Sequence, residues 1–408
     1  EMNMPIEGGP LPGYPDVPYA QSCSMDRCMA RAKEMMDWDS KYPCRDMGNG
    51  KVRGVGVAMA MQGSSIAGVD VGGADIKLNE DGSYTLALGC TDMGTGCDTV
   101  MAQIAADCLN TPMDNIVVFS VDTDISPYDS GSYASATTYT TGVAVMKACE
   151  ELKKKICKLG AEMMEVDEGK VDFDGSCVFY DETLEISDGA DGNAAGHMTD
   201  AEEGYSVDMD AISSENAQKK VSLEDIALKS TFFNNIELQV VKQHSSPISP
   251  PPFMVGMAEV EVDTETGSVD VLDYVAVVDC GTPINPNLAR VQTEGGIAQG
   301  IGMALWEDVQ YTDKGKIRNN SFMQYKIPTR QDIGNIRVDF ECSYEKSGPF
   351  GAKSIGELVI DTPCPALAEA IYNATGVRLT ELPMTPEKIA MEILKNRESI
   401  RSGTKVEE

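Results

Sequence analysis

One arrangement of strand and helix patterns occurs twice along this chain, and it limits the folds that the sequence can adopt. Alternating apolar and polar residues over 74–78 and 84–88, divided by Asp81 and Gly82, predict a β-hairpin. A similar alternation returns over 258–263 and 269–278. Each hairpin leads to a glycine-containing segment and then to apolar residues at helical spacing, over 96–108 and 292–306. The sequence therefore predicts an α+β fold of two related α+β units, a weak internal repeat, with a natural cleft between them.

The rest of the chain is assigned around these two units. Residues 1–65 are expected to hold an N-terminal arm, a helix and an opening strand. The first unit would span 66–250 with a polar insertion at about 187–218, and the second unit would span 251–408. The arm, which is rich in proline and glycine, is expected to extend over a neighbour. Further elements are predicted as helices at about 22–37, 140–164, 362–374 and 385–394, and as strands at about 52–61 and 116–121.

The charge and hydropathy of the chain exclude several classes of partner. The net charge of −32 argues against nucleic acid and against an anionic membrane, because binding phosphates needs clustered lysine and arginine. No stretch of eighteen apolar residues is present, so no membrane span is expected. No basic start is followed by an apolar leader, and a cytoplasmic location is therefore expected.

The cysteines and histidines do not form a metal-binding pattern. The chain has 12 cysteines, but none of them form a C-x-x-C pair, which structural zinc and iron–sulfur sites require. Only His197 and His244 are present. No residue of this chain is therefore predicted to ligate a metal, and a redox metal would have to arrive within a prebuilt cofactor.

Two glycine- or hydroxyl-rich segments could bind an anion. In the first, over 89–99, Gly94 and Gly96 would let backbone amides approach an anion at a helix start. A tight strand-to-helix turn explains the same glycines about as well. In the second, over 129–138, the hydroxyl groups could donate hydrogen bonds to a phosphate or a heterocycle. From the residues alone, the hydroxyls are better explained as caps of the following helix.

A third segment, over 347–357, ends in a carboxylate. The residues around Lys353 suggest a phosphate-binding loop, but Ala352 stands where a Walker motif needs glycine, and we reject that motif. Glu357 follows this loop and precedes an apolar stretch. In such a setting the carboxylate would be desolvated and could act as a general base. A lone glutamate is more often a surface residue or a helix cap.

Taken in order, these segments resemble the xanthine dehydrogenase and aldehyde oxidase family of molybdenum hydroxylases. The family's D-G-S…G…D/E-M-G-Q-G-x-x-T…Q-I-A pattern is similar to residues 81–105, and its D-T…P…S/T-x-A-S pattern to residues 122–135. Its I-N-P…Q-x-E-G-x-x-x-Q-G-x-G pattern resembles residues 284–302, and its G-x-K-x-x-G-E pattern resembles residues 351–357. Four motifs in the same order make a chance match improbable, although each is weak alone.

The resemblance implies a role for individual residues. Glu357 would be the catalytic base beside molybdenum, and Gln292 would hydrogen-bond the pterin. Ala134, with its small side chain, and Tyr133 would lie near the substrate. One position departs from the family, since Thr95 stands where glutamine is usual, and this puts one side-chain contact to the cofactor in doubt. The remaining residues implied to bind the pyranopterin and its phosphate are Gly94, Thr95, Gly96, Thr99, Ser135, Thr137 and Thr138.

The resemblance also implies a cofactor, partners and an activity. The cofactor would be molybdenum with molybdopterin, and the molybdenum would carry a terminal sulfur or selenium. The nucleotide form of the pterin is left open, and a cytosine dinucleotide is one possible form. The family's first-half motif F-G-G-F/G-x-x-Q, its iron–sulfur cysteines and its flavin domain are not found in this sequence. A split subunit is therefore implied, as in the nicotinate dehydrogenase of anaerobic bacteria, with the other half of the molybdenum subunit, an iron–sulfur subunit and an FAD subunit as partners. The N-terminal arm, with Tyr14 and Tyr19, would then cross toward the missing half.

The implied activity is hydroxylation of a small nicotinate-like N-heteroaromatic substrate, with water as the oxygen source. Two alternatives stay open. Purines such as xanthine, or aldehydes, could be oxidised by the same chemistry. The chain could also be a non-catalytic structural subunit that retains the fold; Thr95 favours this alternative and Glu357 opposes it.

Overall fold

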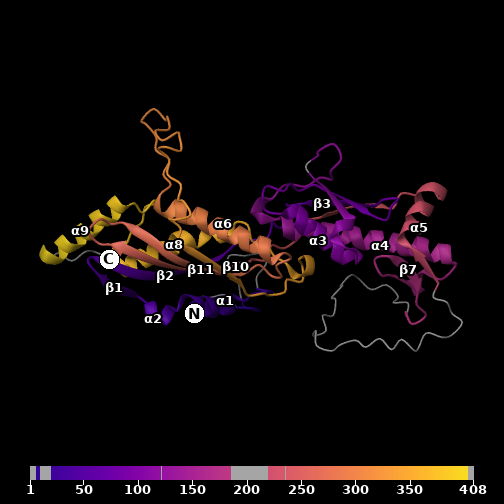
Figure 1. The fold of residues 1–408 in the computed structure, drawn as a ribbon, viewed down its shortest axis with the longest axis horizontal. Coiled ribbons are helices and arrows are strands. Elements are labelled where there is room, and N and C mark those ends of the chain that lie inside the picture. The colour runs from indigo at the N-terminus through magenta and orange to yellow at the C-terminus, as the bar shows by residue number, and fades with distance from the viewer. Residues whose placement is uncertain (1–5, 10–19, 121, 185–218, 235, 403–408) are drawn as a thin grey trace.

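A computed structural model describes residues 6–9, 20–120, 122–184, 219–234 and 236–402. Two α+β bodies lie side by side along its long axis (Figure 1). The predicted α+β fold class is therefore confirmed. The insertion predicted at 187–218 and the arm residues Tyr14 and Tyr19 lie outside the described residues. Over the ranges given above, we find no helix with the length and apolar character needed to cross a membrane.

The first body is a four-stranded sheet covered by two helices. The hairpin of β3 (Gly72–Leu78) and β4 (Tyr84–Leu88) is flanked by β9 (Gln239–His244) and by β5 (Ile116–Ser120), which runs parallel to β4. One side of the hairpin is buried against α3 (Cys97–Leu109) and α4 (Gly142–Met164). The alternation in the sequence thus places one face of each strand in the core. At the far end, a smaller sheet and one short helix pack on α4: β6 (Val171–Phe173), β7 (Cys177–Tyr180), β8 (Lys220–Ser222) and α5 (Leu223–Leu228).

The second body is a five-stranded sheet with helices on both faces. Its strand order is β1 (Cys44–Gly48), β2 (Lys51–Met61), β10 (Phe253–Asp263), β11 (Val269–Asp279) and β12 (Asn335–Phe340). The segment before residue 65 therefore contributes two strands to the sheet of the second unit. The helices of this body are α1 (Met25–Met36), α2 (Trp38–Lys41), α6 (Pro286–Leu305), α7 (Leu358–Asp361), α8 (Pro363–Thr375) and α9 (Pro386–Ser402).

Strand β10 shows why both faces of this sheet are covered. Phe253, Val255 and Met257 belong to the core that α1 closes, whereas Met254 and Ala258 belong to the core under α6 and α8. Because successive side chains point to opposite faces, an unbroken apolar run such as this one needs a helix layer on each side. The sequence predicts this strand only over 258–263, and the apolar run before residue 258 explains the two layers.

The two bodies share an order of elements. In each, an antiparallel hairpin is followed by a helix and then by a strand parallel to the hairpin's second strand: β3, β4, α3 and β5 in one, β10, β11, α6 and β12 in the other. The internal repeat itself stays a prediction. Most of the predicted helices and strands are found with shifted ends, and α6 begins at Pro286, six residues before its expected start. Strands β1, β6, β7, β8, β9 and β12 were not predicted.

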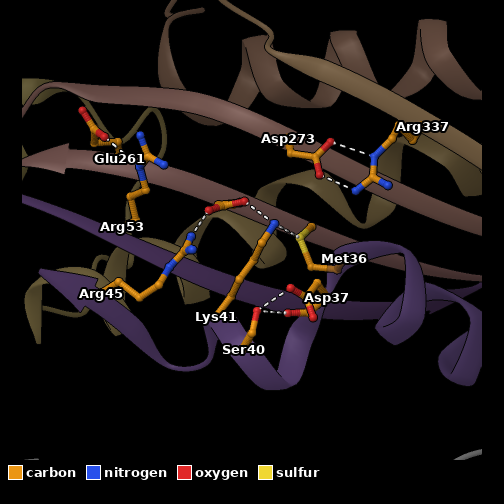
Figure 2. A network of polar contacts seen from close by, with 10 residues as sticks. Met36, Asp37, Ser40, Lys41, Arg45, Arg53, Glu261, Asp273 and Arg337 are labelled. Carbon is orange, nitrogen blue, oxygen red and sulfur yellow. Dashed lines mark hydrogen bonds and ion pairs between the residues drawn. The ribbon is translucent and has the colours of Figure 1, made fainter. Parts of the chain in front are cut away.

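A network of ion pairs ties the edge of the second sheet together (Figure 2). On β10, the buried carboxylate of Glu259 accepts from Lys41 at 2.6 Å and also contacts Arg45. Two residues on, Glu261 contacts Lys51 at 2.7 Å and Arg53 at 2.8 Å. These contacts join β1 and β2 to β10, so they fix the outer strands to the centre of the sheet.

Replacing Glu259 by alanine is expected to destabilise this edge. Its removal leaves Lys41 and Arg45 facing each other without a carboxylate, and we expect the free energy of unfolding to fall by about 2 kcal/mol. Urea denaturation of the purified chain measures this. The exposed Glu265, in the turn that follows β10, provides a matched control. Glu265→Ala should change the same quantity by less than about 0.5 kcal/mol. Equal changes in the two variants would show that Glu259 holds no strand in place.

Candidate active site

A pocket of about 280 Å³ lies where the two bodies meet. The first body contributes residues 93–100 and 132–138, and the second contributes 280–292 and 352–357. The helix start of α6 connects the two sides. Asn285 caps this helix by accepting from the Leu288 N–H at 3.0 Å, and its side-chain amide donates to Gln103 of α3 at 3.1 Å. The pocket is thus built between the two bodies, from segments that are far apart in the sequence.

The structure brings six of the predicted site residues to this pocket. They come from all four segments, and they are Thr95, Ser135, Thr137, Thr138, Gln292 and Glu357. Five others are not among the residues that line it: Gly94, Gly96, Thr99, Tyr133 and Ala134. The convergence expected of segments separated by more than two hundred positions is therefore found, while the role of each residue stays a prediction.

In the turn over 92–98, backbone amides donate to the side chain of Asp92. Asp92 Oδ1 accepts from the N–H of Gly94 at 2.8 Å and of Gly96 at 3.1 Å. The amides that the family pattern assigns to the cofactor therefore already have a carboxylate partner. Both glycines have a positive φ, and a Cβ on Gly96 would lie 2.6 Å from Leu288 Cδ1. Gly96 is therefore needed for the close approach of α3 to α6.

This turn gives the protein a measurable dependence on acid pH. Burial acts to raise the pKa of Asp92, but the N–H groups over 94–98 outweigh it, so the pKa lies below its ordinary value. A lowered pKa stabilises the fold above the ordinary aspartate value of about 4, and this contribution is lost as the pH falls through the lowered value. Asp92→Ala should lower the free energy of unfolding at neutral pH by about 1–2 kcal/mol, because two N–H groups lose their acceptor.

Asp92→Asn is the matched control, since it keeps the acceptor oxygen and removes the charge. In urea denaturation this variant should lose less stability than Asp92→Ala at neutral pH, and less than the wild type between about pH 4 and pH 2. If the wild type and Asp92→Asn respond to acid in the same way, the carboxylate does not hold the turn.

The hydroxyl-rich turn after residue 131 is strained and points at Glu357. Ala134 and Ser135 have φ values of 44° and 55°, in the left-handed region of the backbone that residues other than glycine rarely adopt. In this conformation Ser135 Oγ accepts from the backbone N–H of Glu357 at 2.9 Å. A Cβ on Gly356 would lie 2.9 Å from the same oxygen. The strained turn and the glycine together allow this contact, and the Ser135 hydroxyl keeps its own proton to donate.

Glu357 occupies the position where these segments converge. It precedes α7, and its Oε2 accepts a hydrogen bond from the side-chain amide of Gln62. The predicted desolvation is wrong for this chain by itself, because the residue lies at the open edge of the pocket and is exposed. One consequence for a neighbour is visible: burial and the negative charge of Glu357 both raise the pKa of Asp361.

The turn over 62–65 belongs to the site, and sequence reasoning missed it. Ser64 Oγ is buried and accepts from the N–H of Ser354 at 3.0 Å, and Ser354 Oγ donates to Gly63 O at 3.2 Å. Ser65 N–H donates to Ala134 O at 3.1 Å. This turn therefore joins the two loops that meet at Glu357. The sequence shows only a strand followed by a glycine and two serines, which predicts a turn and no chemistry.

Beneath the pocket, a buried ion pair holds the loop that leads to Glu357. Lys353 Nζ lies 3.1 Å from Asp279 Oδ1, and both side chains are fully buried. The same ammonium group donates to Ser22 O at 3.2 Å and lies over the ring of Phe253. The Lys353 ammonium is thus committed to the second body's core, and it is not arranged as a phosphate-binding lysine.

Comparison with known proteins identifies the family. Residues 31–334 match the family model described as a molybdopterin cofactor-binding domain, and the chain belongs to this family, that of the molybdenum-binding subunits of molybdenum hydroxylases. Two curated relatives come from Escherichia coli (strain K12). The "Probable hypoxanthine oxidase XdhD" is 33% identical over 91% of this chain and 35% of that protein. The "Putative xanthine dehydrogenase molybdenum-binding subunit XdhA" is 28% identical over 90% of this chain and 46% of that protein.

Solved structures show the same fold. The quinoline 2-oxidoreductase from Pseudomonas putida 86 superposes with a TM-score of 0.77 at 22% identity, over 92% of this chain and 46% of that one. The carbon monoxide dehydrogenase from Oligotropha carboxidovorans has the same TM-score at 21% identity, over 96% of this chain and 48% of that one. This chain therefore spans less than half of the length of each relative named here.

Proposed function

We propose that this chain builds one half of a molybdenum site that hydroxylates an electron-poor carbon of a small N-heteroaromatic substrate, with oxygen from water. The observation that carries the proposal is that the segments over 132–138 and 352–357 meet at one pocket on Glu357, which the turn over 62–65 contacts through Gln62. A carboxylate held by groups from separate elements at a pocket edge is positioned for proton transfer.

The pocket fits molybdopterin by the chemistry of its side chains. The residues that line it include seven with a side-chain hydroxyl and two with a side-chain amide, among them Thr95, Ser135, Thr137, Thr138 and Gln292. Such groups suit a phosphate-bearing heterocycle. Ser65 Oγ, next to this site, is buried without a hydrogen-bond partner in the described part of the chain. When bound, the cofactor would supply molybdenum with a terminal sulfur or selenium, and two-electron redox chemistry.

The role proposed for Glu357 is to move one proton. Its Oε2 accepts from Gln62, and its Oε1 has no hydrogen-bond partner among the described residues. Oε1 would accept the proton of the water-derived hydroxyl whose oxygen reaches the substrate. The Ser135 contact to the Glu357 N–H would keep the carboxylate at the pocket edge while the substrate ring enters beside Ala134 and Tyr133.

Partners are part of the proposal, because Glu357 lies exposed at the pocket edge. A polypeptide that supplies the other half of the molybdenum subunit would cover Glu357 and provide the desolvation that this chain lacks. Between α6 and β12, the chain leaves the sheet as a projecting arm (Figure 1), on which Phe322 and Met323 are 84% and 87% exposed. Exposed apolar side chains of this size suit a surface that a partner covers. An iron–sulfur subunit, an FAD subunit and a cytoplasmic location complete the proposal.

A second candidate keeps the chemistry and changes the substrate. The relatives named above include a probable hypoxanthine oxidase and a putative xanthine dehydrogenase subunit, which favours a purine. Other relatives are named nicotine 6-hydroxylase and 6-hydroxypseudooxynicotine dehydrogenase, which favours a pyridine ring. Both classes present an electron-poor carbon next to a ring nitrogen.

The test is elemental analysis of the natively purified complex, followed by substrate profiling. We expect molybdenum in a constant ratio to this chain, with a second polypeptide that completes the subunit, and turnover of nicotinate-like or purine substrates. A complex without molybdenum would instead assign the chain to the non-catalytic alternative. Turnover of aldehydes alone would replace the substrate class and leave the chemistry in place.

A further inference from the structure

We propose that Gln62 is a positioning residue for the base, holding Glu357 through an amide that can serve both of its protonation states. This inference rests on the proposed function, because it assigns Gln62 a part in the proton transfer made by Glu357. Neither the family pattern nor the sequence reasoning above gives Gln62 any role.

The backbone on both sides of the contact is fixed. Gln62 follows the last residue of β2, and the next residues are tied to the 352–357 loop by two hydrogen bonds between Ser64 and Ser354 and between Ser354 and Gly63. A Cβ on Gly63 would lie 2.5 Å from Ser249 Oγ, so this turn is also packed closely on its other side. With both ends held, the amide of Gln62 meets the Glu357 carboxylate without a long flexible approach.

The amide of Gln62 has both a donor group, its NH2, and an acceptor, its carbonyl oxygen. Its nitrogen donates to Glu357 Oε2, which stabilises the carboxylate. Its carbonyl oxygen is buried and has no hydrogen-bond partner among the described residues. A half-turn of the amide would exchange the two atoms, and the carbonyl oxygen would then accept from a protonated Glu357. The same side chain can therefore hydrogen-bond Glu357 both before and after the carboxylate takes the proton.

The charged groups near Glu357 make a neutral donor useful. Asp361 lies one turn further along α7, where burial and the negative charge of Glu357 raise the pKa of Asp361, so this neighbour supplies no positive charge to Glu357. Lys353, four residues earlier in the loop, is committed to Asp279. The backbone N–H of Glu357 is bonded to Ser135, and this leaves Gln62 as the side chain that donates to the carboxylate within the described residues.

The first test compares the activity of two variants in the complete, molybdenum-loaded complex. Gln62→Met keeps the length of the side chain and removes the donor, and Gln62→Glu places a second carboxylate against the first. We expect kcat to fall about tenfold in Gln62→Met with little change in KM, and the acid side of the pH profile to move up by about one pH unit. The move should be larger in Gln62→Glu, an order that a merely structural role does not predict.

Gln239→Met is the matched control, because Gln239 donates to the carboxylate of Asp75 in the four-stranded sheet, in the same kind of contact away from the pocket. Its pH profile and kcat should equal those of the wild type. Elemental analysis should show equal molybdenum in all variants. Unchanged pH profiles in both Gln62 variants, in a wild type that is active, would overturn the inference and leave the proposed function standing.

The second test needs no cofactor. In the purified, cofactor-free chain, a double-mutant cycle of Gln62→Met and Glu357→Leu reports the contact directly through the urea midpoint of unfolding. We expect Glu357→Leu to shift the urea midpoint less in the Gln62→Met background than in the wild type. Additive shifts would overturn the inference. If the wild-type complex contains no molybdenum, the proposed function is wrong, and Gln62 has no role in it. This holds for any result of the double-mutant cycle.

Discussion

Replacing Glu357 by glutamine is expected to reduce turnover of the complete complex by about 10²–10⁴-fold, the contribution typical of a positioned general base. Glutamine has the shape of glutamate but cannot take a proton at the position of Oε1. The backbone N–H of residue 357 would still donate to Ser135, so the loop should keep its place. We therefore expect the molybdenum content to equal that of the wild type while kcat falls, measured by elemental analysis and steady-state kinetics.

Glu381→Gln is the control for this substitution. The Glu381 side chain is 83% exposed, and it lies outside the segments that form the pocket. Its variant should have wild-type turnover. Retained activity in Glu357→Gln would remove Glu357 from the role of base, whatever its place in the pocket. Loss of molybdenum together with activity would instead indicate that Glu357 helps to hold the cofactor.

Local pattern predicted much of the fold. The strands β3 and β4 alternate clearly, β10 and β11 alternate over part of their length, and apolar residues at helical spacing mark α3 and α4. The missed strands have weaker signals. Asn335–Phe340 carries charged side chains at two of its six positions, and Cys44–Gly48 is a short, exposed edge strand. What makes them strands is the neighbour that each pairs with, a contact that no local window contains.

The site residues also differ in whether a local pattern in the sequence could predict them. The segments around Thr95, Ser135, Gln292 and Glu357 could be brought together only through a family pattern, because they are far apart in the sequence and meet only in the folded pocket, where Glu357 N–H donates to Ser135. A local signal was available for Asp92, since a carboxylate two residues before Gly94 can accept from its amide. No local signal was available for Gln62, whose partner is Glu357, 295 positions away.

The sequence also could not show how exposed Glu357 is. An apolar stretch after a glutamate predicts burial of that stretch, and Leu358 and Val359 are indeed buried. The carboxylate one position earlier points to the opposite side, toward the pocket edge. Its environment therefore depends on what else covers the edge, which no local pattern around residue 357 can show.

Replacing Lys353 by methionine is the stability change from which we expect the largest effect. Asp279 would stay fully buried with only neutral donors, the N–H groups of Ser24 and Gly281 and the hydroxyl of Ser343. Removing one partner of a buried ion pair typically costs about 3–5 kcal/mol, and we expect the free energy of unfolding to fall by this amount. The reverse change, Asp279→Asn, leaves the ammonium buried and should have an effect of similar size.

The double variant separates the charge from the packing. Methionine fills much of the volume of lysine, and with both charges absent no buried ion is left without a partner. Lys353→Met with Asp279→Asn should therefore be more stable than the sum of the single changes predicts, by at least about 1 kcal/mol in urea denaturation. Lys346, exposed in the preceding loop, is the control, and Lys346→Met should change stability by less than about 0.5 kcal/mol. Additive single effects would mean that Lys353 and Asp279 stabilise the loop independently, and that the ion pair does not hold the loop that ends at Glu357.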